Sequence, residues 1–207
     1  MPPTPVRFAS GGLILEGLLH HPATGQATTM VVICHPHPQR GGDMHNSVVA
    51  IVTDAVNEAG MSALAFNFRG VGASQGSYDN GEGEQDDSRA ALAFARGLDG
   101  VTTVALAGYS FGAGVAARVI NDTIPSLALV AAPTRMLDAP SLAVYRGPIL
   151  LATGSLDDIS SLEAVRAKAM QLGDRVTVAG IDGADHFWWG KQQELAAEIR
   201  EFFAPLA

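Results

Sequence analysis

At 207 residues, of which 47% are hydrophobic and 16% are charged, the chain is long enough to bury a substantial core, and we expect one domain over residues 1–207. Its net charge of −8 argues against nucleic acid or an anionic membrane surface as the main partner, because both require basic patches. The chain has no apolar stretch that could cross a bilayer, and its start, "MPPTPVRF", has no signal-peptide core, so we expect a cytoplasmic location.

Short runs of β-type residues alternate with segments of helical period along the chain. The expected strands, in chain order, are Val6–Ala9, Leu13–His20, Met30–Cys34, Ser62–Phe68, Thr103–Tyr109, Leu127–Ala131, Ile149–Thr153 and Arg175–Ala179. The middle strands are nearly continuous apolar runs, as is typical of parallel strands covered on both faces. Cys34 is the only cysteine, so an internal disulfide is excluded, and we expect a small buried side chain there.

Three apolar stripes predict helices between these strands. They consist of Val48, Ile51, Val52, Ala55, Val56 and Ala59; of Leu162, Val165, Ala169 and Leu172; and of Leu195, Ile199 and Phe202. The second helix is expected to open with a capping box, Ser160 followed by Glu163, and to end at Gly173. Together the elements predict an α/β fold with a mostly parallel central sheet of about eight strands and helices on both faces.

The motif G-x-S-x-G, which holds the nucleophile of many hydrolases at a strand-to-helix turn, occurs twice. "GASQG" around Ser74 lies in a glycine-rich stretch that is typical of a loop. "GYSFG" around Ser110 follows a predicted strand and precedes the apolar helical segment "GAGVAARVI". We therefore interpret Ser110 as the nucleophile, with the N–H of Phe111 directed at a developing oxyanion. The alternative is a packing turn with an idle serine.

A serine hydroxyl needs a base, and the base needs a third group to orient it. In this arrangement the chain order is serine, acid, histidine. Of the six histidines only His186, in "GADHFWW", follows Ser110, which makes it the candidate base. His20, His21, His35, His37 and His45 all precede the serine.

The acid is expected after the next-to-last strand, where "GSLDD" supplies Asp157 and Asp158. We favour Asp157, because hydrolases of this kind usually place the acid three residues after the glycine that ends the strand. Asp158 remains an alternative, and so do Asp182 and Asp185.

Several segments together resemble a small bacterial branch of the α/β-hydrolase superfamily, lidless serine hydrolases related to esterases and dienelactone hydrolases. They are "CHPHPQRGGDMHN", "FNFRGVGASQG", "GYSFGAGVAARV", "GSLDD" and "GADHFWWG", and they cover most of the chain from about residue 30 onward. The resemblance implies the α/β-hydrolase fold. Dienelactone hydrolases use a cysteine nucleophile where this chain has Ser110, so their reaction is not carried over.

The loop after Cys34 is where such hydrolases hold their second oxyanion donor. Many relatives have His-Gly there, whereas this chain has His35-Pro36. Proline lacks a backbone N–H, so by elimination, and by the position of the equivalent donor in relatives, the N–H of His37 is the candidate. We expect the His35 ring to support the loop through hydrogen bonds to the turn Asn67–Gly70.

A metal site is the alternative for this loop, because H-x-H resembles metal ligation and Asp43 and His45 are near in sequence. The two prolines disturb the required geometry, and the sequence has no matching ligand cluster downstream. We therefore expect neither a metal nor a cofactor.

Four other residues have no assigned catalytic role. Arg69 is expected to stabilise loops beneath the site, with substrate contact as the alternative. Asp86 and Asp87 have the pattern of solvated acids near a helix start. Trp188 is a possible substrate contact, but packing against the last helix is an equally good interpretation.

The segment "TRMLDAPSLAVYR" between the sixth and seventh strands has room for one short helix, so we expect no cap domain. These observations predict a lidless serine hydrolase of small carboxylic esters or thioesters. An acyltransferase or amidase with the same catalytic residues, or a non-catalytic binding protein with the same fold, is the alternative. The sequence does not indicate the oligomeric state.

Overall fold

The computed structural model describes residues 2–207, and its eight strands form one sheet in the order β1-β2-β4-β3-β5-β6-β7-β8. β1 and β2 pair antiparallel with each other, β2 pairs antiparallel with β4, and every other neighbouring pair is parallel. The predicted fold class, a mostly parallel sheet in an α/β fold, is confirmed. The strands are β1 (Thr4–Ser10), β2 (Leu13–His20), β3 (Thr29–Cys34), β4 (Ser62–Phe66), β5 (Thr103–Tyr109), β6 (Leu127–Val130), β7 (Ile149–Gly154) and β8 (Val176–Ile181).

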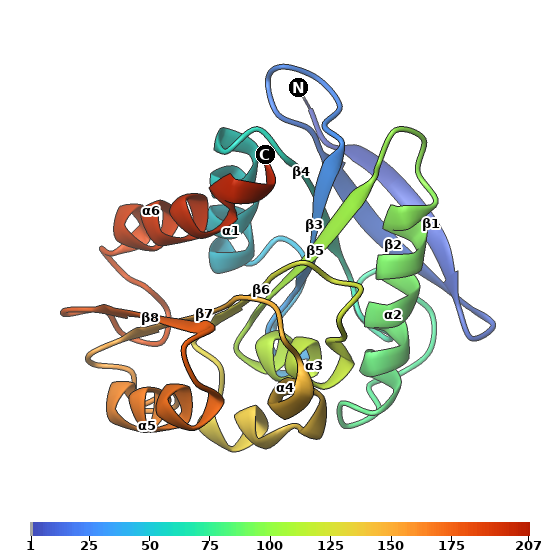
Figure 1. Ribbon diagram of the computed structural model, residues 1–207. Coiled ribbons are helices and arrows are strands. Elements are labelled where there is room, and N and C mark those ends of the chain that lie inside the picture. Colours follow the sequence, from blue (N-terminus) through green and yellow to red (C-terminus); the bar gives the residue numbers. More distant parts are fainter. Residues whose placement is uncertain (1) are drawn as a thin grey trace.

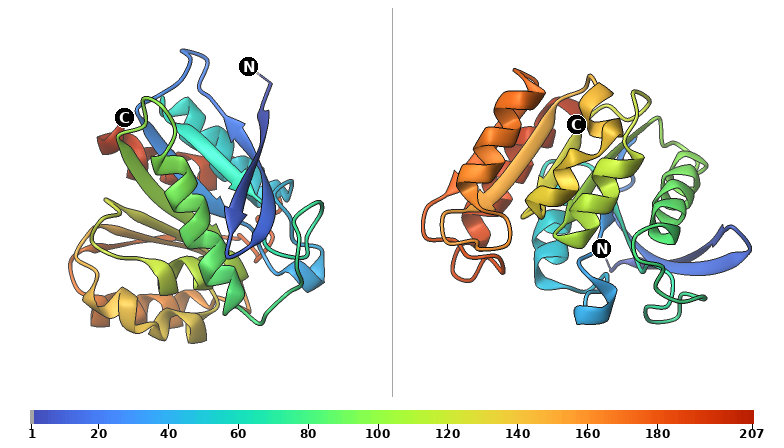
Figure 2. Two further views of the ribbon diagram at one scale, coloured as in Figure 1. Left: turned by 90° about the vertical axis from the view of Figure 1, so that its right-hand side faces the viewer. Right: turned by 90° about the horizontal axis from the view of Figure 1, so that it is seen from below.

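Helices cover both faces of the sheet, as Figures 1 and 2 show. On one face α1 (Ser47–Glu58) and α6 (Gln192–Phe203) pack against the strands and against each other. The other face is covered by α2 (Gly83–Arg96), α3 (Phe111–Val119), α4 (Pro140–Val144) and α5 (Leu162–Leu172). Each face has its own apolar core, which is why every residue of β3 to β7 except the first of β5 is buried.

Three short 3-10 helices complete the described elements: η1 (Pro38–Arg40), η2 (Thr134–Asp138) and η3 (Ala204–Leu206). The segment between β6 and β7 forms η2 and α4, two short helical pieces where the sequence predicted room for only one. Both pack on α3. They leave the sheet edge without a separate cap domain, in agreement with the prediction.

The start of α5 differs from the prediction by one residue. The N-cap is Ser161, whose hydroxyl accepts a hydrogen bond from the N–H of Ala164 at 3.4 Å. Ser160 is buried instead, and its hydroxyl donates to the carbonyl of Ala132 at 2.7 Å. The capping box was therefore wrong, because a tertiary contact occupies the first serine. The predicted end of the helix at Gly173 is confirmed, with a φ of 86°.

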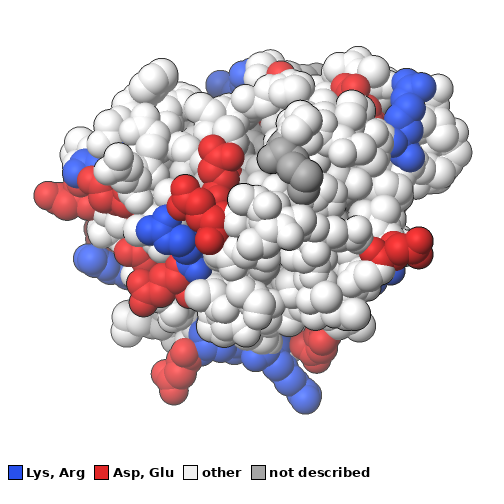
Figure 3. Space-filling model, turned by 90° about the horizontal axis from the view of Figure 1, so that it is seen from above, with Lys and Arg blue, Asp and Glu red and all other residues white. Residues whose placement is uncertain are grey.

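Figure 3 shows the charged side chains on one face of the molecule. On the face seen in Figure 3, basic and acidic residues lie side by side in small mixed groups. Among residues 2–207, no helix combines the length and the apolar character that a membrane crossing requires.

Candidate active site

Ser110 lies at the turn between the end of β5 and the start of α3, with φ 53° and ψ −118°. A positive φ is strained for a residue with a side chain, and such strain is typical of functional turns. The glycines on either side make the turn possible. A Cβ on Gly108 would lie within 3 Å of the backbone of Gly112, and a Cβ on Gly112 would lie equally close to the backbone of Cys34. The turn therefore brings α3 against both β5 and the loop after β3.

Three side chains from three different strand ends form one hydrogen-bonded chain. The Ser110 Oγ lies 3.0 Å from the Nε2 of His186. The Nδ1 of His186 lies 2.9 Å from the Oδ2 of Asp157 and 3.1 Å from its Oδ1. The parallel strands β5, β7 and β8 all end at the same edge of the sheet, so the loops that follow them meet there.

The Asp157 carboxylate is buried and is fixed by the backbone as well as by the histidine. Its Oδ1 accepts the N–H of Ile159 at 2.9 Å and the N–H of Ser160 at 2.7 Å. Burial alone would raise the pKa of Asp157, but the hydrogen bonds from His186 and from these two N–H groups outweigh it and lower the pKa. The carboxylate is therefore charged, so the Nδ1 of His186 carries the proton and Nε2 is free to accept one from Ser110.

The other candidate acids have different surroundings. Asp158 is exposed, and among the described residues its carboxylate makes no hydrogen bond or ion pair with His186. Asp182 accepts the hydroxyl of Ser155 at 3.1 Å, and Asp185 accepts the N–H of Phe187 at 3.0 Å. Of the four candidate carboxylates, Asp157 is the one that the structure brings to the histidine.

Tyr109 holds the main chain of His186, a contact that the sequence analysis missed. Its buried hydroxyl donates to the carbonyl of His186 at 2.9 Å. Burial, with a smaller contribution from Asp157 and Asp185, raises the pKa of Tyr109, so the hydroxyl keeps its proton and remains a donor. The two partners are 77 residues apart in sequence, and no local pattern could have connected them.

The loop after β3 places His37 beside the serine turn. The ring of His37 lies 5.0 Å from the ring of Phe111 and 5.1 Å from that of Tyr78, measured between centroids. The carbonyl of His37 accepts the N–H groups of Arg40 and Gly42, which closes the loop into a tight turn. Among the described residues, the N–H groups of His37 and Phe111 donate to no other protein group. His37 and Phe111, the residues of both predicted donors, also line the same cleft as Ser110.

The His35 ring supports this loop, as predicted. Its Nε2 accepts the N–H of Phe68 at 3.0 Å, and its Nδ1 lies 2.6 Å from the carbonyl of Pro36. Burial lowers the pKa of His35 to about 4, so the ring is neutral and Nδ1–H is the donor. Both ring nitrogens are thus engaged in hydrogen bonds. No cluster of three or more potential metal ligands occurs within residues 2–207.

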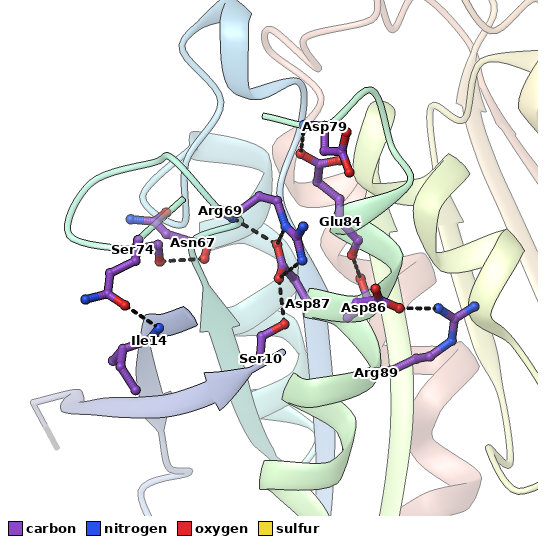
Figure 4. Close-up of polar contacts among 12 residues, drawn as sticks. Ser10, Ile14, Asn67, Arg69, Ser74, Asp79, Glu84, Asp86, Asp87 and Arg89 are labelled. Carbon is purple, nitrogen blue, oxygen red and sulfur yellow. Dashed lines mark hydrogen bonds and ion pairs between the residues drawn. The ribbon is translucent and has the colours of Figure 1, made fainter. Parts of the chain in front are cut away.

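Arg69 stabilises the loops beneath the site through an ion pair with Asp87 (Figure 4). The guanidinium donates to both carboxylate oxygens, at 3.0 and 2.9 Å, and the Arg69 N–H donates at 3.0 Å. The hydroxyl of Ser10 donates to the same carboxylate at 2.8 Å. The bracing role of Arg69 is therefore confirmed, but the prediction of Asp87 as a solvated acid was wrong. Asp86 is exposed and pairs with Arg89, as expected for a surface acid.

The second copy of the serine motif is structural. The hydroxyl of Ser74 donates to the carbonyl of Asn67 at 2.7 Å, as Figure 4 shows. It also accepts the N–H of Glu16 in β2 at 3.0 Å, so both functions of the hydroxyl serve to hold the loop on the sheet. The interpretation of this motif as a loop is confirmed.

The Ser110 turn opens onto a cleft of about 500 Å³. It is lined by Pro36, His37, Arg40, Gly42, Asn46, Tyr109, Ser110, Phe111, Pro133, Arg135, Met136, Ile159, His186 and Phe187. The suggestion that Trp188 contacts substrate is corrected, because its side chain is fully buried in the core on the α6 face. Phe187 lines the cleft instead and is 60% exposed.

Comparisons with known proteins identify the class to which this fold and site correspond. The structure is similar to that of an α/β serine hydrolase homologue from Coxiella burnetii, with 34% identity, a TM-score of 0.89 and 97% of each chain covered. A lidless α/β serine hydrolase from Xanthomonas campestris is 29% identical over 100% of this chain and 95% of that one, again with a TM-score of 0.89.

Two further proteins are similar to this chain. A putative α/β hydrolase from Agrobacterium tumefaciens is 30% identical, with a TM-score of 0.87 over 97% of this chain and 94% of that one. An uncharacterized protein of Rickettsia prowazekii is 31% identical over an alignment of 191 residues, and the match covers 87% of this chain and 80% of that protein. No family model matches the sequence. The chain belongs to the lidless α/β serine hydrolases, and its function is of the hydrolase type.

Proposed function

We propose that this protein cleaves small carboxylic esters, or thioesters, through an acyl-enzyme formed on Ser110. The observation that carries the proposal is the unbroken hydrogen-bonded chain from the Ser110 Oγ through His186 to the buried Asp157 carboxylate. Ser110 and His186 line the cleft, so a substrate can reach the serine. A nucleophile, a base and an orienting acid within hydrogen-bond distance of one another are the requirement for serine-based acyl transfer.

In the first half of the proposed reaction, Nε2 of His186 takes the hydroxyl proton while the Ser110 Oγ bonds to the carbonyl carbon. The carbonyl π electrons move to oxygen, and the N–H groups of Phe111 and His37 stabilise the oxyanion. Asp157 orients the imidazole and stabilises its positive charge. When the carbonyl re-forms, the bond to the alcohol oxygen breaks and His186 donates its proton to that oxygen.

The second half repeats these steps with water. His186 removes a proton from the water as its oxygen bonds to the acyl carbon, and the second tetrahedral intermediate collapses with release of the carboxylic acid. The proton returns to the Ser110 Oγ. The protein groups and water supply every proton and electron pair, so the proposed reaction requires no cofactor.

The shape of the site supports a small substrate. The segment between β6 and β7 forms only the short elements η2 and α4, so the cleft is not enclosed by a lid. Ile159 and Phe187, which are 49% and 60% exposed, give the His186 side of the cleft an apolar lining. Such an open cleft suits short esters better than long lipid chains, which require enclosure.

A fluorophosphonate probe tests the nucleophile directly, because it forms a covalent adduct with an activated serine. The wild-type protein should be labelled, and Ser110→Ala should not be. Ser74→Ala, checked for folding by circular dichroism, is the matched control from the second copy of the motif and should still be labelled. Absence of labelling in the wild-type protein would favour the non-catalytic binding protein over the enzyme.

The reaction class is tested by steady-state kinetics on a panel of p-nitrophenyl esters and acyl-thioesters of increasing chain length. We expect turnover of the shortest acyl groups, and Ser110→Ala should abolish it. Added alcohols or amines that capture the acyl group in preference to water would identify an acyltransferase.

A further inference from the structure

Two arginines that line the cleft, Arg40 and Arg135, have no partner among residues 2–207. Arg40 is the last residue of η1, which follows β3, and Arg135 lies in η2, which follows β6. The two arginines therefore reach the cleft from two different loops. Both are exposed, and within residues 2–207 neither side chain makes an ion pair or a hydrogen bond. Arg118 and Arg200, by contrast, are paired with Glu82 and Glu58.

The charge of the cleft is opposite to that of the protein. The chain has 21 acidic and 13 basic residues, a net charge of −8, yet no aspartate or glutamate is among the residues that line the cleft. A second pocket adjoins the cleft at Arg135 and Met136, and its lining includes Glu82 and Asp138. Both carboxylates have partners of their own, since Glu82 pairs with Arg118 at 3.5 Å and Asp138 with Lys168 at 2.7 Å. Arg135 borders that pocket as well, but within residues 2–207 no carboxylate forms an ion pair with Arg135 or with Arg40.

Arg40 acts electrostatically on the catalytic region. The pKa of His37 is lowered first by burial and then by the positive charge of Arg40, while Glu84 opposes the effect. The ring of His37 packs on Phe111, the residue next to Ser110. The charge of Arg40 is thus close enough to influence a group that borders the reacting atoms.

We propose that Arg40 and Arg135 form an anion subsite in the cleft, and that the substrate is a small ester carrying a carboxylate or phosphate group near the scissile bond. This inference rests on the proposed esterase function. Guanidinium groups bind carboxylates and phosphates through paired N–H donors, and an uncompensated positive cleft attracts anions. The apolar side of the cleft, at Ile159 and Phe187, is left for the rest of the substrate.

The test compares two esters with the same number of acyl carbons, anionic 4-nitrophenyl hemiglutarate and neutral 4-nitrophenyl valerate, after correction for spontaneous hydrolysis. The measured quantity is the ratio of kcat/KM for the anionic ester to that for the neutral ester. We expect Arg40→Gln and Arg135→Gln each to lower this ratio about three- to tenfold, as for the loss of one exposed charge contact. Raising the ionic strength should lower the wild-type ratio as well, because salt screens exposed charges.

Arg89→Gln is the matched control, because it removes the same charge from an exposed position on α2 outside the cleft, and its ratio should equal that of the wild type. If both cleft variants keep the wild-type ratio while neutral esters are still cleaved, the anion subsite is wrong and the esterase function stands.

Two further substrates carry the anion on the alcohol side of the ester, O-acetylglycolate with a carboxylate and acetylated glycerol phosphate with a phosphate. Their hydrolysis rates, measured as acid release in a pH-stat, distinguish a carboxylate from a phosphate as the preferred anion.

Binding measured without catalysis separates the two proposals. Calorimetry on the Ser110→Ala protein should show that monomethyl glutarate binds more tightly than dimethyl glutarate, and that Arg40→Gln and Arg135→Gln remove the difference. That result supports the subsite even if no ester is hydrolysed. Equal binding of the two compounds to Ser110→Ala overturns it.

Discussion

Replacing Asp157 by asparagine should move the proton of the neutral His186 ring from Nδ1 to Nε2. In the structure the Oδ1 of Asp157 accepts two backbone N–H groups, at 2.9 and 2.7 Å, while Oδ2 lies 2.9 Å from the Nδ1 of His186. An asparagine side chain will keep its oxygen at the backbone donors, because its amide nitrogen cannot accept from them. The amide N–H then donates to Nδ1, which forces the imidazole proton onto Nε2. Nε2 is the atom that must accept the proton of Ser110.

The expected loss in kcat is on the order of 10³- to 10⁴-fold, or about 4 to 5 kcal/mol of barrier, because the wrong tautomer removes the base without disturbing the site. The assay is steady-state hydrolysis of a p-nitrophenyl ester, with the fold verified by circular dichroism. Asp158→Asn is the matched control and should stay within about twofold of the wild type, because that side chain is exposed and, among the described residues, makes no hydrogen bond with His186. An Asp157→Asn variant that keeps more than a tenth of wild-type kcat would refute this reasoning.

Three further predictions concern the groups that hold the site. Lowering the pH from about 7 to about 5 should decrease the unfolding free energy by about 2 kcal/mol, because at pH 5 His35 is protonated in the unfolded chain but mostly neutral in the folded protein, where burial lowers its pKa to about 4. Urea unfolding at several pH values checks this, and a His35→Gln variant with the same pH dependence would contradict it. Asp87→Asn should cost about 3 to 5 kcal/mol of stability because it breaks a buried ion pair, whereas the exposed Asp86→Asn should cost less than about 0.5 kcal/mol; equal melting temperatures for the two variants would be inconsistent with the burial of Asp87. Tyr109→Phe leaves the carbonyl of His186 without its hydrogen bond, which should lower kcat about tenfold through loss of the position of the imidazole, and unchanged kinetics would show that the backbone holds the loop alone.

The sequence by itself determined most of the helices and strands and the candidate nucleophile and base. Burial on both faces of a parallel sheet requires continuous apolar runs, so the strands were predicted with small errors at their ends. The turn at Ser110 requires small neighbours, and Gly108 and Gly112 are visible in the sequence for that reason. The chain order of the three groups left His186 as the one histidine available, and the structure brings its ring to the serine.

Only the tertiary structure decided which of two residues adjacent in sequence points into the protein or into the site. Asp157 and Asp158 differ by one position, and the backbone donors at residues 159 and 160 select the first. Asp87 is buried because Arg69 and Ser10, from distant segments, satisfy its charge, which no helical pattern reveals. Trp188 lies in the core and Phe187 in the cleft. The physical reason is the same in each case: adjacent side chains point in different directions, and the contacts that select one of them come from residues far away in the sequence.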